Sequence, residues 1–185
     1  KKNTKRLRLT SKILSKEHNE DYFLSRNCLT YPDDEIFLNK VVLPKSWENH
    51  SRTIKINNKC KKSYDQIFPF LVKSLNKLHN INENKIFWER IIGQWLYLYL
   101  INYFEKLDRL DRAIKIKPNL VAHSLDFNSF KVFKSRLQFE ALFRESEEVH
   151  LQQFSLILKY HYPENVEFFP LNWSASKQDE WKLFD

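Results

Sequence analysis

Glu17 and His18 carry the side chains best suited to proton transfer in this sequence. They lie in a polar loop that follows the first apolar segment of the chain. A histidine or a carboxylate can remove a proton from an attacking hydroxyl group, so His18 beside Glu17 is the candidate catalytic pair. Adjacency in sequence does not establish hydrogen-bond distance, and a solvated polar loop is the alternative interpretation.

Four side chains that can bind a substrate follow the second and third apolar segments. They are Arg26, Lys45, Trp47 and Glu48. Arginine and lysine bind phosphate groups through charge-assisted hydrogen bonds, and a tryptophan can stack on a sugar ring. A surface salt bridge and a half-buried aromatic ring are the alternative, since amphipathic aromatics often lie partly buried without a ligand.

Gly93 is the only glycine of the 185 residues and falls inside a helical segment. Glycine there costs about 1 kcal/mol relative to alanine, so a local feature must require it. Close approach of another backbone is one explanation, and contact with a bound substrate is the other. A single glycine also excludes the glycine-rich dinucleotide fingerprint and the Walker A loop, which need several.

The cysteines indicate neither a metal site nor a disulfide framework. Cys28 and Cys60 lie far apart, without a C-x-x-C pair or a histidine at ligand spacing. We therefore expect no structural metal and no cofactor, and a reduced, cytoplasmic protein. No signal-peptide pattern follows the basic residues 1–8.

Positive charge is concentrated in the first third of the chain. Residues 1–62 hold 15 Lys and Arg against 7 Asp and Glu, whereas residues 63–185 hold 16 of each. Such a basic part can bind nucleic acid, phosphate or anionic lipid. A lysine- and asparagine-rich composition typical of an A/T-rich genome explains the same charge without a partner.

The apolar pattern predicts an α/β chain with a short parallel-type sheet first and a helix-rich second part. Short strands are expected within 6–14, 22–24 and 41–43, and ligands of such sheets bind at the carboxyl ends of the strands. Helical periodicity begins at Tyr64, and Pro69 marks a kink or the true helix start. We expect one lobe over 1–185, with a strand and loop part (1–62), a helical part (63–162) and an irregular tail (163–185).

Further elements are expected along the second part. A helix over 85–113, capped by Asn82 or Asn84, contains an apolar run at 91–104 that is too short for a membrane span. A strand or extended crossover is expected over 116–125. Helical patterns follow over 130–143, after a cap at Asp126 or Asn128, and over 146–160, with Ser146 as the cap.

Three segments resemble motifs of one family. Residues 42–48 (VLPKSWE) resemble an L-P-x-x-W-(D/E) element, 71–79 (LVKSLNKLH) an L-x-x-x-L-N-x-x-H helix end, and 87–96 (FWERIIGQWL) a (Y/F)-W-x-x-L-(I/L)-G-P-W-L signature. In this order they resemble the N-terminal part of a family of bacterial transferases from surface-carbohydrate, lipopolysaccharide-type gene clusters. The resemblance covers most of the chain, and its specific part is the block of Trp88, Gly93 and Trp95.

The resemblance implies the N-terminal, acceptor-side lobe of an enzyme similar to GT-B glycosyltransferases, with an incomplete Rossmann-like sheet. Family members are longer, which implies that the lobe for the nucleotide-sugar donor is absent and that this chain is inactive alone. The implied partner is a glycan or lipid-linked acceptor. The chain departs from the family at Ser25 and Asn27, within its G-E-W-C, and at Gln94, where the family has proline.

Two other function classes compete with a transferase. The basic part contains interleaved aromatics, as nucleic-acid-binding modules do, although no RNP, KH or zinc-finger signature accompanies them and nucleic acid is the less favoured partner. These aromatics are Tyr22, Phe23, Tyr31 and Trp47. A non-catalytic interaction subunit is the third class. The salt dependence of binding distinguishes the three classes. Nucleic-acid binding weakens steeply with salt, binding of a neutral sugar does not, and an interaction subunit binds neither.

Overall fold

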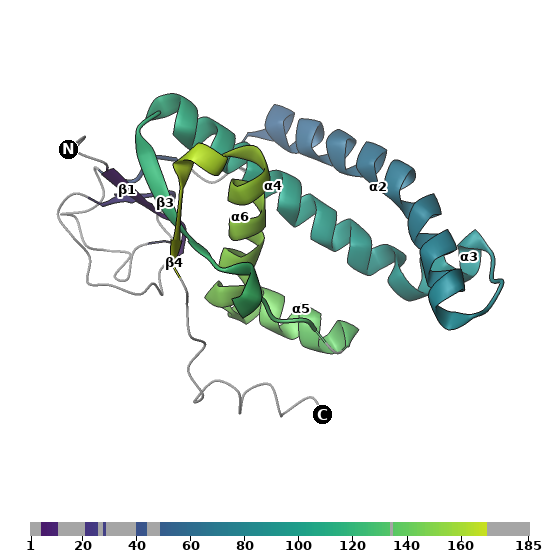
Figure 1. Cartoon of the computed structure of the whole chain (residues 1–185). Coiled ribbons are helices and arrows are strands. Elements are labelled where there is room, and N and C mark those ends of the chain that lie inside the picture. The colour runs from purple at the N-terminus through teal and green to yellow at the C-terminus, as the bar shows by residue number, and fades with distance from the viewer. Residues whose placement is uncertain are drawn as a thin grey trace. The chain divides into compact units, whose positions relative to one another are not determined.

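The computed structural model describes residues 5–10, 21–25, 28, 40–43, 49–133 and 135–169 (Figure 1). The chain forms two compact units. The sheet unit comprises Lys1–Lys45 and Arg109–Asp185, and the helical unit comprises Ser46–Asp108. The α/β class predicted from the sequence is confirmed.

The sheet unit contains a four-stranded, fully parallel sheet. Its strands are β1 (Lys5–Arg8), β2 (Tyr22–Phe23), β3 (Leu120–Leu125) and β4 (Val166–Phe169). They lie in the order β2-β1-β3-β4. The second half of the chain therefore supplies half of the strands. The strand expected within 116–125 is confirmed as β3, whereas residues 166–169 form a strand where the sequence predicted an irregular tail.

The expected third strand is reduced to one bridge. Val41 forms an isolated parallel bridge with Phe23, and its neighbour Val42 donates a backbone hydrogen bond to the Phe23 carbonyl at 2.8 Å. The segment thus extends along β2 without becoming a regular strand among the described residues.

The helical unit contains two long helices, α2 (His50–His79) and α4 (Gln94–Ile116). The part of α4 from Arg109 onward belongs to the sheet unit. Helix α2 begins at His50, because the Asn49 side chain accepts a hydrogen bond from the backbone of Arg52 at 3.0 Å. Residues 50–62 are therefore helical, contrary to the strand and loop prediction. Pro69 lies inside α2 and does not mark its start.

Helices α2 and α4 pack along each other within the helical unit (Figure 1). The Cys60 thiol donates a hydrogen bond to the Tyr97 carbonyl at 3.7 Å, and the Tyr64 and Tyr97 rings meet edge to face at 6.2 Å. The buried core of this pair consists of Cys60, Phe68, Trp88, Leu96 and Leu100. These residues recur at helical spacing, which is why the periodicity predicts both helices.

The turn between these helices is organised around Asn76. Its side chain donates to the carbonyl of Glu83 at 2.8 Å and accepts from the Glu83 backbone at 3.1 Å. The same amide oxygen accepts a hydrogen bond from the indole of buried Trp88 at 2.7 Å. Asn80 ends α2 in the left-handed conformation, and Asn84 caps α3 (Lys85–Trp88), as one of the two predicted caps. Asn76 therefore joins the end of one helix to the start of the next.

The remaining helices belong to the sheet unit. They are the 3₁₀ turn Phe127–Ser129, α5 (Arg136–Glu145), α6 (Glu147–His161) and the 3₁₀ turn Pro163–Asn165. Residues 130–133 are not helical, so the helix predicted over 130–143 begins too early. Ser135 caps the observed helix α5. Ser146 precedes α6, but its hydroxyl donates to the Glu148 carboxylate at 2.8 Å and caps no backbone group.

No helix in the part of the chain that the structure describes is both long enough and apolar enough to cross a membrane.

Candidate functional site

The strand order creates a topological switch point between β1 and β3. The chain leaves β1 to form β2 on one side and later returns to form β3 on the other. In open parallel sheets, ligands bind outside the carboxyl ends of the strands at such a point. The residues at the carboxyl ends of β1 and β3 therefore define the candidate site.

Two buried hydroxyl groups lie near these strand ends. Thr10 follows β1 and is 3% exposed, and Ser124 is the penultimate residue of β3 and is 2% exposed. Neither side-chain oxygen has a hydrogen-bond partner within the described segments. Buried polar groups are normally paired, so these two hydroxyls are candidate partners for a water, an ion or a ligand. They are the strongest indication of a binding site at this edge.

Ser25 and Cys28 lie beyond the carboxyl end of the neighbouring strand β2. Both are buried, and the Ser25 hydroxyl lies 3.6 Å from the Cys28 sulfur. The Cys28 thiol donates to the carbonyl of Leu9, just after β1, at 3.2 Å. Burial raises the pKa of the Cys28 thiol, which keeps it protonated. Cys28 therefore ties the ends of β1 and β2 together and is poorly suited to act as a nucleophile.

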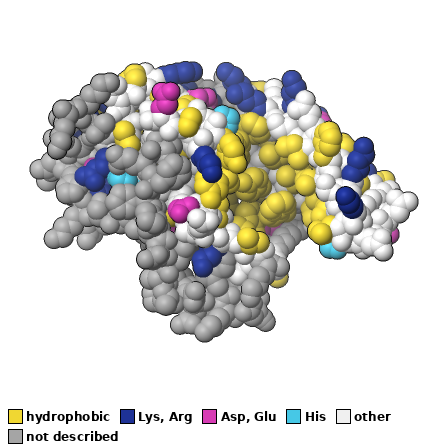
Figure 2. Space-filling model, in the orientation of Figure 1, with side chains coloured by type: hydrophobic (Ala, Val, Ile, Leu, Met, Phe, Trp, Pro, Cys, Tyr) yellow, Lys and Arg dark blue, Asp and Glu magenta, His cyan; other side chains and the backbone are white. Residues whose placement is uncertain are grey.

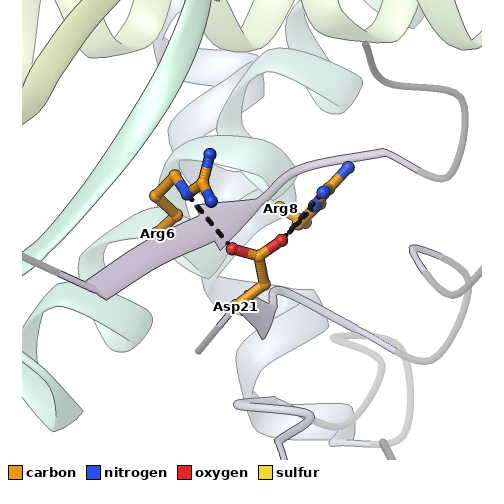
Figure 3. Close-up of polar contacts among 3 residues, drawn as sticks. All are labelled: Arg6, Arg8 and Asp21. Carbon is orange, nitrogen blue, oxygen red and sulfur yellow. Dashed lines mark hydrogen bonds and ion pairs between the residues drawn. The ribbon is translucent and has the colours of Figure 1, made fainter. Parts of the chain in front are cut away.

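A buried carboxylate joins the start of β2 to the middle and end of β1 (Figure 3). Asp21 precedes β2, is 1% exposed, and forms ion pairs with Arg8 at 2.8 Å and with Arg6 at 3.2 Å. Arg6 and Arg8 are two residues apart in β1, so both project from one face of the sheet toward Asp21. This cluster fixes the register of β2, which has only two residues.

The end of β3 is held by α6 and by a side-chain cap. The Ser155 hydroxyl accepts a hydrogen bond from the Leu125 backbone at 2.8 Å, and donates to Leu151 within its own helix. Asp126 accepts from the backbone of Asn128 at 3.2 Å and caps the 3₁₀ turn Phe127–Ser129, and not the helix for which the sequence predicted it as a cap. Both contacts orient the chain as it leaves the candidate site.

Most of the residues predicted from the sequence lie outside the described part of the chain. These are Glu17, His18, Arg26, Lys45, Trp47 and Glu48. Arg26 directly follows Ser25 in sequence. Thr10 and Ser124 were missed, because a hydroxyl side chain next to an apolar strand gives no sign of being unpaired. No group of three or more potential metal ligands occurs among residues that the structure describes.

Gly93 lies in the helical unit, away in sequence from the strand ends. It ends a π-helical turn, Glu89–Gly93, between α3 and α4. A Cβ atom at this position would lie 2.7 Å from the Tyr64 hydroxyl and 3.1 Å from the Glu89 side chain. A side chain of α2, and not another backbone, makes the close approach. Packing therefore accounts for the glycine.

We expect Gly93→Ala to destabilise the chain by about 1–3 kcal/mol, because the added methyl group meets the Tyr64 hydroxyl. In a Tyr64→Phe background the hydroxyl is absent, and the same substitution should instead stabilise by up to about 1 kcal/mol through its higher helix propensity. Urea unfolding of the four members of this double-mutant cycle measures the coupling. Equal effects of Gly93→Ala in both backgrounds would contradict the packing explanation.

Tyr22 forms a second polar cluster of the sheet unit with two lysines. The Lys117 ammonium lies 4.1 Å from the centre of the Tyr22 ring, and Lys5 lies 3.4 Å from its hydroxyl oxygen. Hydrogen bonding with Lys117, and then with Lys5, lowers the pKa of Tyr22 below 10.0. The two ammonium groups favour the phenolate, which carries the opposite charge.

We therefore expect one of the eight tyrosines to ionise at a lower pH than an ordinary tyrosine. Lys117→Met should raise the pKa of Tyr22 more than Lys5→Met does, because Lys117 contributes more. Since the folded-state pKa is the lower one, this contact favours folding only at alkaline pH, and its contribution disappears as pH falls through that pKa. Carbon-13 NMR of labelled tyrosine rings measures the titration, and unchanged Tyr22 titration in Lys117→Met would exclude this cause.

Comparison with known proteins gives one match. A family model described as LIC12162 family transferase matches residues 6–182, which is almost the whole chain. No curated protein and no solved structure matches.

Proposed function

Because the chain belongs to the LIC12162 family of transferases, we propose that it binds the acceptor of a glycosyl transfer at the carboxyl ends of its parallel strands. The proposal rests above all on the two buried hydroxyls of Thr10 and Ser124, which have no hydrogen-bond partner among the residues that the structure describes. A hydroxyl group both donates and accepts, so such groups suit a ligand that is itself rich in hydroxyls.

The transfer would run from a nucleotide-activated sugar to a bacterial surface glycan or its lipid-linked precursor, in the cytoplasm. His18, assisted by Glu17, would take the proton of the acceptor hydroxyl as its oxygen bonds to the anomeric carbon and the sugar–phosphate bond breaks. Arg26 and Lys45 would bind the phosphate of the ligand, and Trp47 and Glu48 its sugar.

The nucleotide-sugar donor would be bound by a second lobe outside these 185 residues, as in GT-B glycosyltransferases. We therefore expect the chain to bind acceptor glycans without transferring sugar by itself. Sugar nucleotides and candidate glycans are incubated with the 185-residue chain, and release of free nucleotide is followed. Nucleotide release above the protein-free control would contradict this division of roles.

Binding of the acceptor is tested with an isosteric substitution. Thr10→Val replaces the hydroxyl with a methyl group, and should weaken glycan binding by about 3- to 10-fold if one hydrogen bond is lost. Thr53→Val, in the helical unit, is the matched control and should leave binding unchanged. Equal binding by both variants, with unchanged thermal unfolding, would place the acceptor elsewhere.

A further inference from the structure

Helix α2 is strongly basic along one face. The helix contains seven Lys and Arg against a single Asp, and all six of its lysines are exposed. Five of them lie on one face of the helix. Their successive spacings of 4, 3, 11 and 4 residues are each close to a whole number of turns, since a turn has about 3.6 residues. This lysine stripe consists of Lys55, Lys59, Lys62, Lys73 and Lys77. It extends for about 33 Å at the usual rise of an α-helix.

Within the described part of the chain, the charges of the stripe are not neutralised by ion pairs. In the segments that the structure describes, no carboxylate forms an ion pair with any of these five lysines. Arg52, on the same helix, is the basic residue that is paired, with Asp108 at 3.5 Å. The stripe therefore presents net positive charge to a partner.

Large hydrophobic side chains are exposed beside the stripe, at the same end of the helical unit. Phe70 is 71% exposed, and it lies on the face of the stripe, since it is eleven residues after Lys59 and seven before Lys77. Leu78 is 76% exposed and Ile86, beyond the turn, is 60% exposed. Figure 2 shows dark-blue basic side chains next to yellow hydrophobic ones over helices α2 and α4.

We propose that the stripe and the apolar end of the helical unit bind the surface of an anionic lipid bilayer. Lysines near such a surface each contribute about 1 kcal/mol of attraction, while exposed Phe, Leu and Ile side chains enter the boundary between headgroups and acyl chains. A nucleic acid would use the lysines equally well, but it gives no reason for exposed aliphatic side chains at the end of the stripe. The combination of both features favours lipid.

The turn next to Leu78 and Ile86 is ordered by the Asn76 hydrogen bonds described above. Its aliphatic residues are thus presented by a rigid structure, and little ordering is required on binding. This surface belongs to the helical unit alone, so the inference does not depend on the proposed transfer reaction.

The test is co-sedimentation of the whole chain with vesicles. We expect binding to vesicles of phosphatidylglycerol and phosphatidylcholine in equal parts, and much weaker binding to phosphatidylcholine alone. Lys62→Gln with Lys73→Gln should weaken binding to the anionic vesicles by about 25-fold, which corresponds to about 1 kcal/mol for each lysine. The matched control, Lys61→Gln with Lys115→Gln, removes the same charge from exposed positions outside the stripe and should have a much smaller effect.

A second substitution separates lipid from other polyanions. Phe70→Ser should weaken vesicle binding while leaving any binding to duplex DNA or RNA unchanged. The proposal is overturned if the chain does not bind anionic vesicles, or if the stripe and control variants lose binding equally. The proposal is also overturned if Lys62→Gln with Lys73→Gln weakens nucleic-acid binding but leaves vesicle binding unchanged.

Discussion

Asp21→Asn is expected to destabilise the protein by about 3–5 kcal/mol. The carboxylate of Asp21 is 1% exposed and pairs with two guanidinium groups, of which that of Arg8 is 9% exposed. Removing one partner of a buried pair leaves the other charge buried and uncompensated, which costs far more than the pair itself contributes. Strand β2 has two residues and few ladder hydrogen bonds, so it depends on this cluster for its position.

The measurement is urea unfolding, with Asp108→Asn as the matched control. Asp108 pairs with Arg52 at 3.5 Å, and both side chains are about a quarter exposed, so its loss should cost at most about 1 kcal/mol. If Asp21→Asn cannot be purified in folded form, Asp21→Leu with Arg8→Met removes the two buried charges, leaves only the partly exposed Arg6, and should recover much of the stability. If the Asp21→Asn variant is as stable as Asp108→Asn, the cluster of Asp21 with Arg6 and Arg8 does not position β2.

Asn76→Ala is expected to have the second largest effect, a loss of about 2–4 kcal/mol. The substitution removes three hydrogen bonds, two with the Glu83 backbone and one with the indole of Trp88. Each is worth about 1 kcal/mol, and the Trp88 indole is 5% exposed, so its N–H group would be left buried without this partner.

The control is Asn84→Ala, in the same turn. Asn84 makes one capping hydrogen bond, to the backbone of Phe87 at 3.0 Å, and its loss should cost about 1 kcal/mol. Thermal and urea unfolding of both variants give the comparison. If Asn76→Ala costs no more than Asn84→Ala, the turn is not held by the Asn76 side chain.

The Asn76 turn also gives a physical reason for two of the sequence motifs. Asn76 and His79 belong to the L-x-x-x-L-N-x-x-H segment, and Trp88 and Gly93 belong to the signature that follows. In the structure Asn76 binds Trp88, the His79 and Trp88 rings lie 5.7 Å apart, and Gly93 makes room for Tyr64. These motif residues therefore build the helical unit, and they carry no evidence of contact with a substrate.

The periodicity predicted the long helices because their buried residues recur at helical spacing, as Phe68 and Leu71 do. It missed the first turns of α2, where lysines and asparagines surround only Ile56 and Cys60 as buried residues. It also missed β4, because a four-residue strand near a proline gives a weak local signal, and pairing with β3 decides its conformation.

The sequence could indicate the region of the candidate site, the carboxyl ends of the strands, but it could not indicate Thr10 and Ser124. Ends of parallel strands attract ligands by a general rule, so a sheet with a switch point indicates the region. That Thr10 and Ser124 are buried, without a partner in the described segments, depends on the packing of strands distant in sequence, which no local pattern records.

The most direct test of the central claim, that the carboxyl ends of β1 and β3 bind a glycan, is NMR with labelled threonine methyl groups. The chain has four threonines, and Thr10 at the site and Thr53 in the helical unit are the informative pair. Surface-glycan oligosaccharides are titrated into the labelled chain. We expect a saturable shift of the Thr10 methyl resonance, while the Thr53 resonance stays unchanged. Saturable binding that leaves the Thr10 resonance unmoved would contradict the claim.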